Sequence, residues 1–69
     1  MSVYRVTEVI GVSEESWEDA AREAVRTAAA TVRDLRVAEV LRKDVTIENG
    51  RVKNFRVRLA LSFKYETGD

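Results

Sequence analysis

The sequence of 69 residues contains no cysteine, no histidine and no proline. Without cysteine there are no disulfides and no thiolate chemistry, and without histidine the usual zinc ligands and a hydrolytic triad are missing as well. A chain this short buries only about 60% of the surface that its unfolded form exposes, so its core is thin. Because neither disulfides nor zinc can reinforce that core, we expect association with other subunits to stabilise it.

An excess of one charge and a long apolar run are also missing. Twelve basic residues balance twelve acidic residues, so the chain lacks the basic excess that binds phosphate backbones or anionic membranes. No apolar run approaches the roughly 20 residues of a membrane helix, and Arg5 and Glu8 lie where a signal peptide would be apolar. We therefore expect a cytoplasmic protein without nucleic-acid or membrane partners. Since no linker or repeat interrupts the sequence, residues 1–69 are predicted to form a single domain.

One window, residues 13–35, has the periodicity of a helix. Its apolar residues recur at spacings of three and four: Trp17, Ala20, Ala21, Ala24, Val25, Ala28, Val32 and Leu35. Ser16 and Asp19 match a capping box, in which Ser16 accepts from the amide three residues on and Asp19 reaches back. The small alanine side chains predict a helix that packs very close to a sheet.

The remaining segments are rich in β-branched residues. Residues 3–11 and 36–48 are predicted strands, and the second carries Val37, Leu41, Val45 and Ile47 on one parity. Asn49-Gly50 is the two-residue turn typical of a hairpin, so the second and third strands are expected to be antiparallel neighbours. The predicted order is β-α-β-β. The chain is therefore assigned to the α+β class, as a two-layer domain with a helix across one face of the sheet.

The last strand is unusually long and one-sided. In the stretch FRVRLALSFKY, from Phe55 to Tyr65, every second residue is apolar. A strand over residues 52–65 would be about 45 Å long at roughly 3.3 Å per residue, whereas a compact domain of this length has a radius of gyration of about 11 Å. We expect another subunit to cover its far end through Phe55, Leu61, Phe63 and Tyr65. The alternative is a strand that bends around the helix and covers itself.

Three stretches resemble the dodecins over nearly the whole chain. They are GVSEESWEDAAREAVRTAA (residues 11–29), DLRVAEV (34–40) and NGRVKNFRVRLALSFKYE (49–66). The resemblance implies a β-α-β-β subunit whose three-stranded antiparallel sheet wraps partly around its helix. It also implies that twelve subunits form a hollow homododecamer with cubic symmetry, which stores or buffers a flavin such as riboflavin or FMN.

The residues expected at the flavin pocket depart from the family pattern. Dodecins hold two flavin rings near a twofold axis between tryptophans, with a glutamine at the ring edge. The matching positions carry Val37 and Arg56, and Asp44 lies where many bacterial members have an arginine suited to a flavin phosphate. Since valine has no π face to stack on the ring, flavin affinity is expected to be weak or absent. The same region is similar to the calcium dodecins, which also lack the tryptophan.

The other candidate residues have alternative interpretations. Trp17 lies in the first helical turn, where packing on the sheet is favoured over flavin contact. The carboxylates Glu8, Glu39, Asp44 and Glu48 form no calcium loop, although repetition about a symmetry axis would supply several oxygens. Each alone is interpreted first as a solvated group or an ion-pair partner. No enzyme activity is predicted. Three hypotheses remain: a flavin-binding shell, a flavin-free shell that binds cations such as calcium, and a purely structural or partner-binding assembly.

Overall fold

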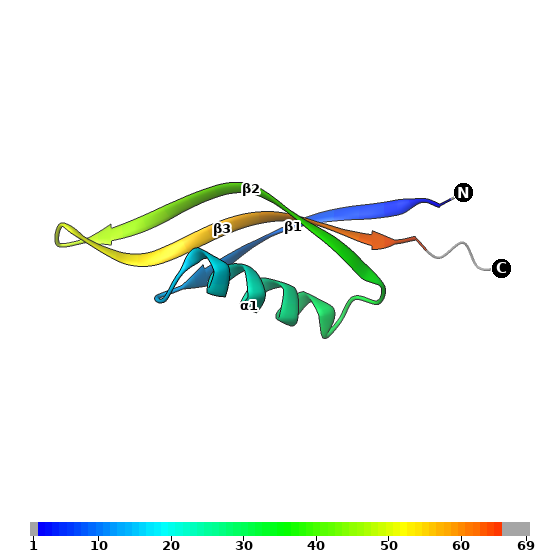
Figure 1. The fold of residues 1–69 in the computed structure, drawn as a ribbon, viewed down its shortest axis with the longest axis horizontal. Helices are drawn as coiled ribbons and strands as arrows, with labels where there is room; N and C mark the ends of the chain where they lie inside the picture. Colours follow the sequence, from blue (N-terminus) through cyan, green and yellow to red (C-terminus); the bar gives the residue numbers. More distant parts are fainter. Residues whose placement is uncertain (1, 66–69) are drawn as a thin grey trace.

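A computed structural model describes residues 2–65, which form one helix against a three-stranded sheet (Figure 1). Glu66, the last residue of the dodecin-like stretch, lies outside the described residues. The elements follow the order β1 (Tyr4–Ser13), α1 (Trp17–Ala29), β2 (Leu35–Glu48) and β3 (Arg51–Lys64). The strands are antiparallel in the order β1-β3-β2, and α1 lies across one face. The α+β class and the β-α-β-β order predicted from the sequence are therefore confirmed.

The helix begins at the predicted cap but ends before the helical pattern of apolar residues in the sequence does. Ser16 Oγ accepts from the Asp19 amide at 3.0 Å, as expected, whereas the Asp19 carboxylate accepts from Ser13 Oγ at 2.7 Å instead of reaching back to Ser16. The helix stops at Ala29, and five residues later the chain turns through a positive φ of 59° at Asp34 and enters β2. The prediction of a helical window up to residue 35 was therefore too long by six residues, from 30 to 35.

Small residues bring α1 very close to β1. Ala20 is fully buried, and a Cβ added to Gly11 would lie 2.2 Å from the Ala20 carbonyl oxygen. Only glycine fits at this position without moving the helix backbone. The close approach predicted from the alanines is confirmed.

The core lies between α1 and the middle of β3. Val57, Leu59 and Leu61 are the largest fully buried side chains, and they pack on Ala20. These three belong to the one-sided stretch that dominated the sequence pattern. Leu61, expected at a subunit contact, is instead buried within the subunit, at 1% exposure.

The hairpin is confirmed, but the single parity expected for β2 is wrong. Asn49 and Gly50 have positive φ angles of 53° and 74° and connect β2 to β3. The register of β2 shifts at three places, between Leu35 and Val37, between Val40 and Arg42, and between Thr46 and Ile47. The first two shifts each insert an extra residue into β2, which moves the following β2 residues to the other face, whereas the third inserts one into β3. Val37, opposite Ser62, therefore lies on the face away from the helix, whereas Val45, opposite Phe55, lies on the helix face.

The subunit is far longer than a compact domain. Its principal extents are 55 × 20 × 13 Å and its radius of gyration is 14.3 Å, above the roughly 11 Å of a globular chain of this size. The β2–β3 hairpin extends past one end of α1, and the outer ends of β1 and β3 extend past the other (Figure 1). The prediction that the strands outrun the domain is confirmed.

The end beyond the helix carries aromatic and cationic groups. The Arg5 guanidinium lies 5.8 Å from the ring centres of both Phe63 and Tyr65, and the Tyr65 amide donates to the Val3 carbonyl. Phe63 is half-buried by these contacts, whereas Tyr65 is exposed. The chain therefore covers the far end of its own last strand only in part, because it shields Phe63 better than Tyr65.

Candidate functional site: the open face of the sheet

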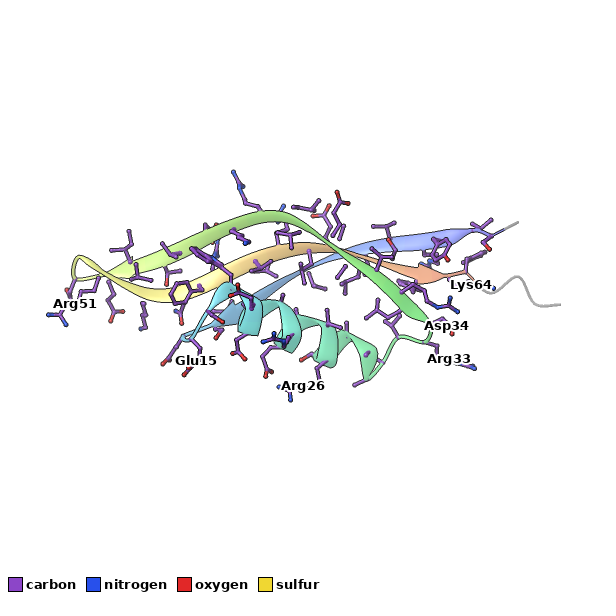
Figure 2. All side chains as sticks on the ribbon, viewed as in Figure 1. Glu15, Arg26, Arg33, Asp34, Arg51 and Lys64 are labelled. Carbon is purple, nitrogen blue, oxygen red and sulfur yellow. The ribbon has the colours of Figure 1, made fainter. Side chains whose placement is uncertain are left out.

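The sheet face turned away from α1, here called the open face, has exposed side chains from all three strands (Figure 2). Residues directly opposite each other on paired strands share a face, so the open face is organised in rows across β1, β3 and β2. From the N-terminal end of β1 inward, the four rows are Val6–Ser62–Val37, Glu8–Ala60–Glu39, Ile10–Arg58–Arg42 and Val12–Arg56–Asp44. We call them the valine, acidic, basic and ion-pair rows.

Arg56 and Asp44, two of the three residues matched to a flavin pocket, bind each other. Arg56 Nε lies 2.7 Å from Asp44 Oδ1, and Arg56 Nη2 lies 2.9 Å from Asp44 Oδ2. Such a two-point ion pair fixes both side chains and uses the donors that would face a ligand. Asp44 and Arg56 are thus committed to a contact within the subunit.

Val37, the third residue, lies apart from this ion pair. It is opposite Ser62 and 55% exposed, in the valine row. Ser62 and Arg56 are six residues apart on β3, or about 20 Å at roughly 3.3 Å per residue. One subunit therefore does not combine Val37 with the ion pair in a single pocket.

The arginines on this face shift the titration of Asp44. The hydrogen bond from Arg56 holds the pKa of the Asp44 carboxyl below its usual range, against a smaller opposing effect of desolvation. The charges of Arg56, Arg42 and Arg58 lower this pKa further, and Asp44 in turn raises the pKa of Arg56. The carboxylate therefore stays ionised under mildly acidic conditions.

We expect the ion pair to contribute stability that acid removes. A carboxyl with a depressed folded pKa stabilises the fold fully above its unfolded pKa of about 3.9 and loses that contribution as the pH falls through the folded pKa. Unfolding should be measured by denaturant titration between pH 6 and 2.5 for the wild type and Asp44→Asn. The free energy of unfolding should be larger for the wild type than for the variant at pH 6, and this difference should disappear below about pH 4. A difference that does not change with pH would contradict a stabilising ion pair.

The four carboxylates considered as metal ligands lie on separate parts of the sheet. Glu8 lies 3.6 Å from Arg58, Glu48 lies 2.9 Å from Lys53, and Asp44 is held by Arg56. Glu39 lies across Ala60 from Glu8 in the acidic row. Among residues 2–65, no group of three or more acidic side chains is placed to hold a metal ion. A site with three or more carboxylates from residues 2–65 would therefore need more than one copy of the chain.

Trp17 packs on the sheet, as the preferred interpretation predicted. Its ring meets Phe55 edge-on, with centres 5.1 Å apart, and Lys43 Nζ lies 5.6 Å from its centre. The indole Nε1 donates to the Asp44 carbonyl at 3.1 Å. Phe55, expected at a subunit contact, is thereby half-buried within the subunit. The sole tryptophan touches the backbone of the residue whose side chain holds the ion pair on the opposite face.

Sequence reasoning named Arg42 only as an ion-pair partner for nearby carboxylates and did not predict its place beside Arg58. Arg58 and Arg42 lie directly opposite each other on the open face, beside Arg56 and Asp44. The signal was present in FRVRLAL, where arginines occupy the parity opposite to the buried apolar residues. The alternation of residues in β2 does not predict the face on which Arg42 lies, because a β-bulge precedes it.

In the described part of the chain, α1 is too short and too polar to cross a membrane.

Comparison with known proteins agrees with the fold and extends over nearly the whole chain. Residues 3–66 match the family model for dodecin. The calcium dodecin of Mycobacterium tuberculosis is 45% identical over 64 residues, which cover 93% of this chain and 90% of the relative. The solved structure of that protein, described as a calcium-chelating antigen with a novel calcium-binding site, has a TM-score of 0.83 at 42% identity and covers 99% of this chain and 97% of its own.

A second solved structure, the dodecin of Streptomyces coelicolor, is similar at 40% identity, with a TM-score of 0.92 over 97% of this chain and 96% of its own. The solved structures agree with the β-α-β-β fold described above, and the family model and the relative agree on the family. The chain belongs to the dodecin family.

Proposed function

We propose that this chain is the subunit of a hollow homododecamer that binds a small ligand and has no catalytic role. The observation that carries this proposal is the shape of the subunit, which is 55 Å long although its fully buried apolar core consists of a few residues. Exposed apolar side chains lie along its strands, among them Val6, Ile10, Val12, Val37, Ile47, Val52 and Tyr65. Surface of this kind is typical of subunits that are covered by their neighbours.

The ligand we favour is a cation such as calcium, rather than flavin. The calcium dodecin relative supports this choice, as does the pairing of Arg56 with Asp44, which uses the hydrogen-bonding groups at one flavin-matched position. Val37 offers apolar contact without a stacking face at the other position. Oxygen ligands for calcium would come from Glu8, Glu39, Asp44 or Glu48, repeated about symmetry axes. Riboflavin or FMN is the alternative ligand, and a purely structural shell is the outcome if neither binds.

Light scattering and calorimetry test the two parts of this proposal. The purified protein at micromolar concentration should have about twelve times the 7.8 kDa mass of the subunit. After treatment with a chelator, titration with CaCl₂ should release or absorb heat, whereas riboflavin should keep its fluorescence on mixing. A monomer or dimer would overturn the assembly. If CaCl₂ gave no heat and the fluorescence of riboflavin were quenched, flavin would replace calcium as the favoured ligand.

A further inference from the structure

We propose that the basic row and the ion-pair row together bind a small oxyanion, of the class of inorganic phosphate or sulfate, on the open face. The site lies within one subunit, so it does not rest on the proposed assembly or on the choice of calcium. Its donors are the guanidiniums of Arg42, Arg56 and Arg58, and Asp44 and Ile10 complete its walls.

A partly enclosed hollow lies where these two rows meet. Its volume is about 30 Å³, and it is lined by Ile10, Arg42, Asp44, Arg56 and Arg58. A water molecule needs about 10–15 Å³, so the hollow has room for a small ion rather than for a ring system. Three guanidiniums against one carboxylate leave two positive charges in excess. A hollow with this balance of charge concentrates small anions.

The register places the four charged groups at the corners of a rectangle. Arg42 lies opposite Arg58, and Asp44 lies opposite Arg56. The Cβ atoms of facing residues on paired strands are about 5 Å apart, and residues two apart on one strand are separated by about 7 Å. Arginine side chains are long enough to reach one oxyanion from three of these corners.

Two of the three arginines have no strong partner within the subunit. Arg42 and Arg58 face each other, and like charges in this position destabilise a sheet. Glu8 lies 3.6 Å from Arg58, and no ion pair of Arg42 is found among residues 2–65. Because an oxyanion between the two guanidiniums would replace this repulsion with two attractions, their arrangement favours a bound anion.

The ion pair holds the third arginine in place. Asp44 binds Arg56 through Nε and Nη2, so the two N–H groups of Nη1 stay available to a further acceptor. A guanidinium fixed in this way loses less side-chain freedom when it binds an oxyanion. Asp44 therefore positions Arg56, although it also adds one negative charge beside the anion. The same positive surroundings make Asp44 a poor ligand for calcium, which leaves Glu8, Glu39 and Glu48 as the cation candidates.

Titration calorimetry of the purified wild type with sodium phosphate tests the site. The protein is kept in a chloride buffer at constant ionic strength, so that general screening is the same at every point. Phosphate should give saturable heat, and sulfate should compete with it. Arg42→Gln and Arg58→Gln each remove a charged donor and should weaken phosphate affinity about tenfold or more. Both positions are exposed, so circular dichroism should show folded variants.

Two further variants separate this site from the total charge of the protein. Arg22→Gln removes the same charge from an exposed position on α1, on the other side of the sheet, and should leave phosphate affinity unchanged. Asp44→Asn removes the one carboxylate of the hollow and should strengthen phosphate binding. Competition by glycerol 3-phosphate would add phosphate esters to the ligand class, and its absence would restrict the class to free oxyanions.

Thermal unfolding gives a second readout. In chloride, Arg42→Gln should be at least as stable as the wild type, because it removes the repulsion between Arg42 and Arg58. Phosphate should then raise the unfolding temperature of the wild type by more than that of the variant. The variant serves as the reference because phosphate stabilises proteins in general by exclusion from their surface.

Three results would each overturn the site. They are a wild type that gives no saturable heat with phosphate, an equal loss of affinity in Arg22→Gln and Arg42→Gln, and weaker phosphate binding by Asp44→Asn. Saturable binding that is weakened only by changes to Arg42 or Arg58, together with the larger thermal effect in the wild type, supports it.

Discussion

Replacing Phe63 with aspartate is expected to dissociate the assembly before it unfolds the helix. Phe63 lies at the end of the sheet beyond α1, where its ring is half-buried beside Arg5 and no helix covers it. A fully buried phenylalanine costs about 3–5 kcal/mol when truncated, so the cost within the subunit should be smaller here. Aspartate at this position also faces Arg5, its partner in the register, and can form an ion pair with it. The subunit should therefore stay folded while its apolar contact with a neighbour is lost.

Light scattering and circular dichroism together measure this result. The Phe63→Asp protein should have the mass of a dissociated subunit and a helical spectrum, with reduced thermal stability because folding and association are linked by mass action. Tyr65→Asp is the companion variant, since the Tyr65 ring is exposed in the subunit and belongs to no core. An unfolded Phe63→Asp protein beside a fully assembled Tyr65→Asp protein would show that Phe63 stabilises the subunit rather than the contact.

The parts of the fold that were predictable depend on local chemistry. Asn49-Gly50 fixes the hairpin because few residues adopt positive φ at both turn positions, and both residues have positive φ here. The start of α1 was also predictable, because the Ser16 side chain caps the helix directly. The excess length of β3 followed from counting residues.

The pairing of Asp44 with Arg56 was not predictable in this way. A strict register from the Asn49-Gly50 turn pairs Glu48 with Arg51 and Ile47 with Val52, as observed. Continued without change, it would place Asp44 opposite Phe55. One extra β3 residue between the Ile47 and Thr46 pairings shifts the register, and Asp44 meets Arg56 instead. Nothing in the local sequence marks this bulge, so the register beyond it was not predictable.

The resemblance to dodecins located residues that spacing alone did not. Val37, Arg56 and Asp44 entered as matched positions, and the structure places all three on the open face. It does not bring Val37 close to the other two within one chain. The three positions therefore share one face of the sheet, and combining them in one pocket would need a second copy of the chain.

Restoring the family residues should recover riboflavin binding. The wild type should bind riboflavin at high micromolar concentration or more weakly, because Val37 cannot stack and Arg56 is held by Asp44. The change Val37→Trp with Arg56→Gln supplies a stacking face and an amide. Since Arg56→Gln leaves the Asp44 carboxylate without its partner, Asp44→Asn should be added in a triple variant. Riboflavin has no phosphate, so its binding is insensitive to the missing arginine at position 44.

The expected gain is at least tenfold in affinity. Each aromatic contact contributes about 0.5–1.5 kcal/mol beyond buried area, and each hydrogen bond contributes about 0.5–1.5 kcal/mol. Because about 1.4 kcal/mol corresponds to a factor of ten, one contact of each kind is sufficient at the middle of these ranges, about 2 kcal/mol together. The gain should appear only in assembled protein, since Val37 and Arg56 lie about 20 Å apart along one subunit at roughly 3.3 Å per residue.

Fluorescence quenching of riboflavin decides this prediction for the wild type, the double variant and the triple variant. The added variant Phe63→Asp in the triple background is the control, because a dissociated subunit should lose the recovered binding. Tight binding by the wild type would show that Arg56 or another group already clamps the ring. No gain in the assembled triple variant would show that the pocket has been rebuilt beyond these three positions. Equal gains in the assembled and dissociated proteins would place the site within one subunit, against the separation of the valine and ion-pair rows.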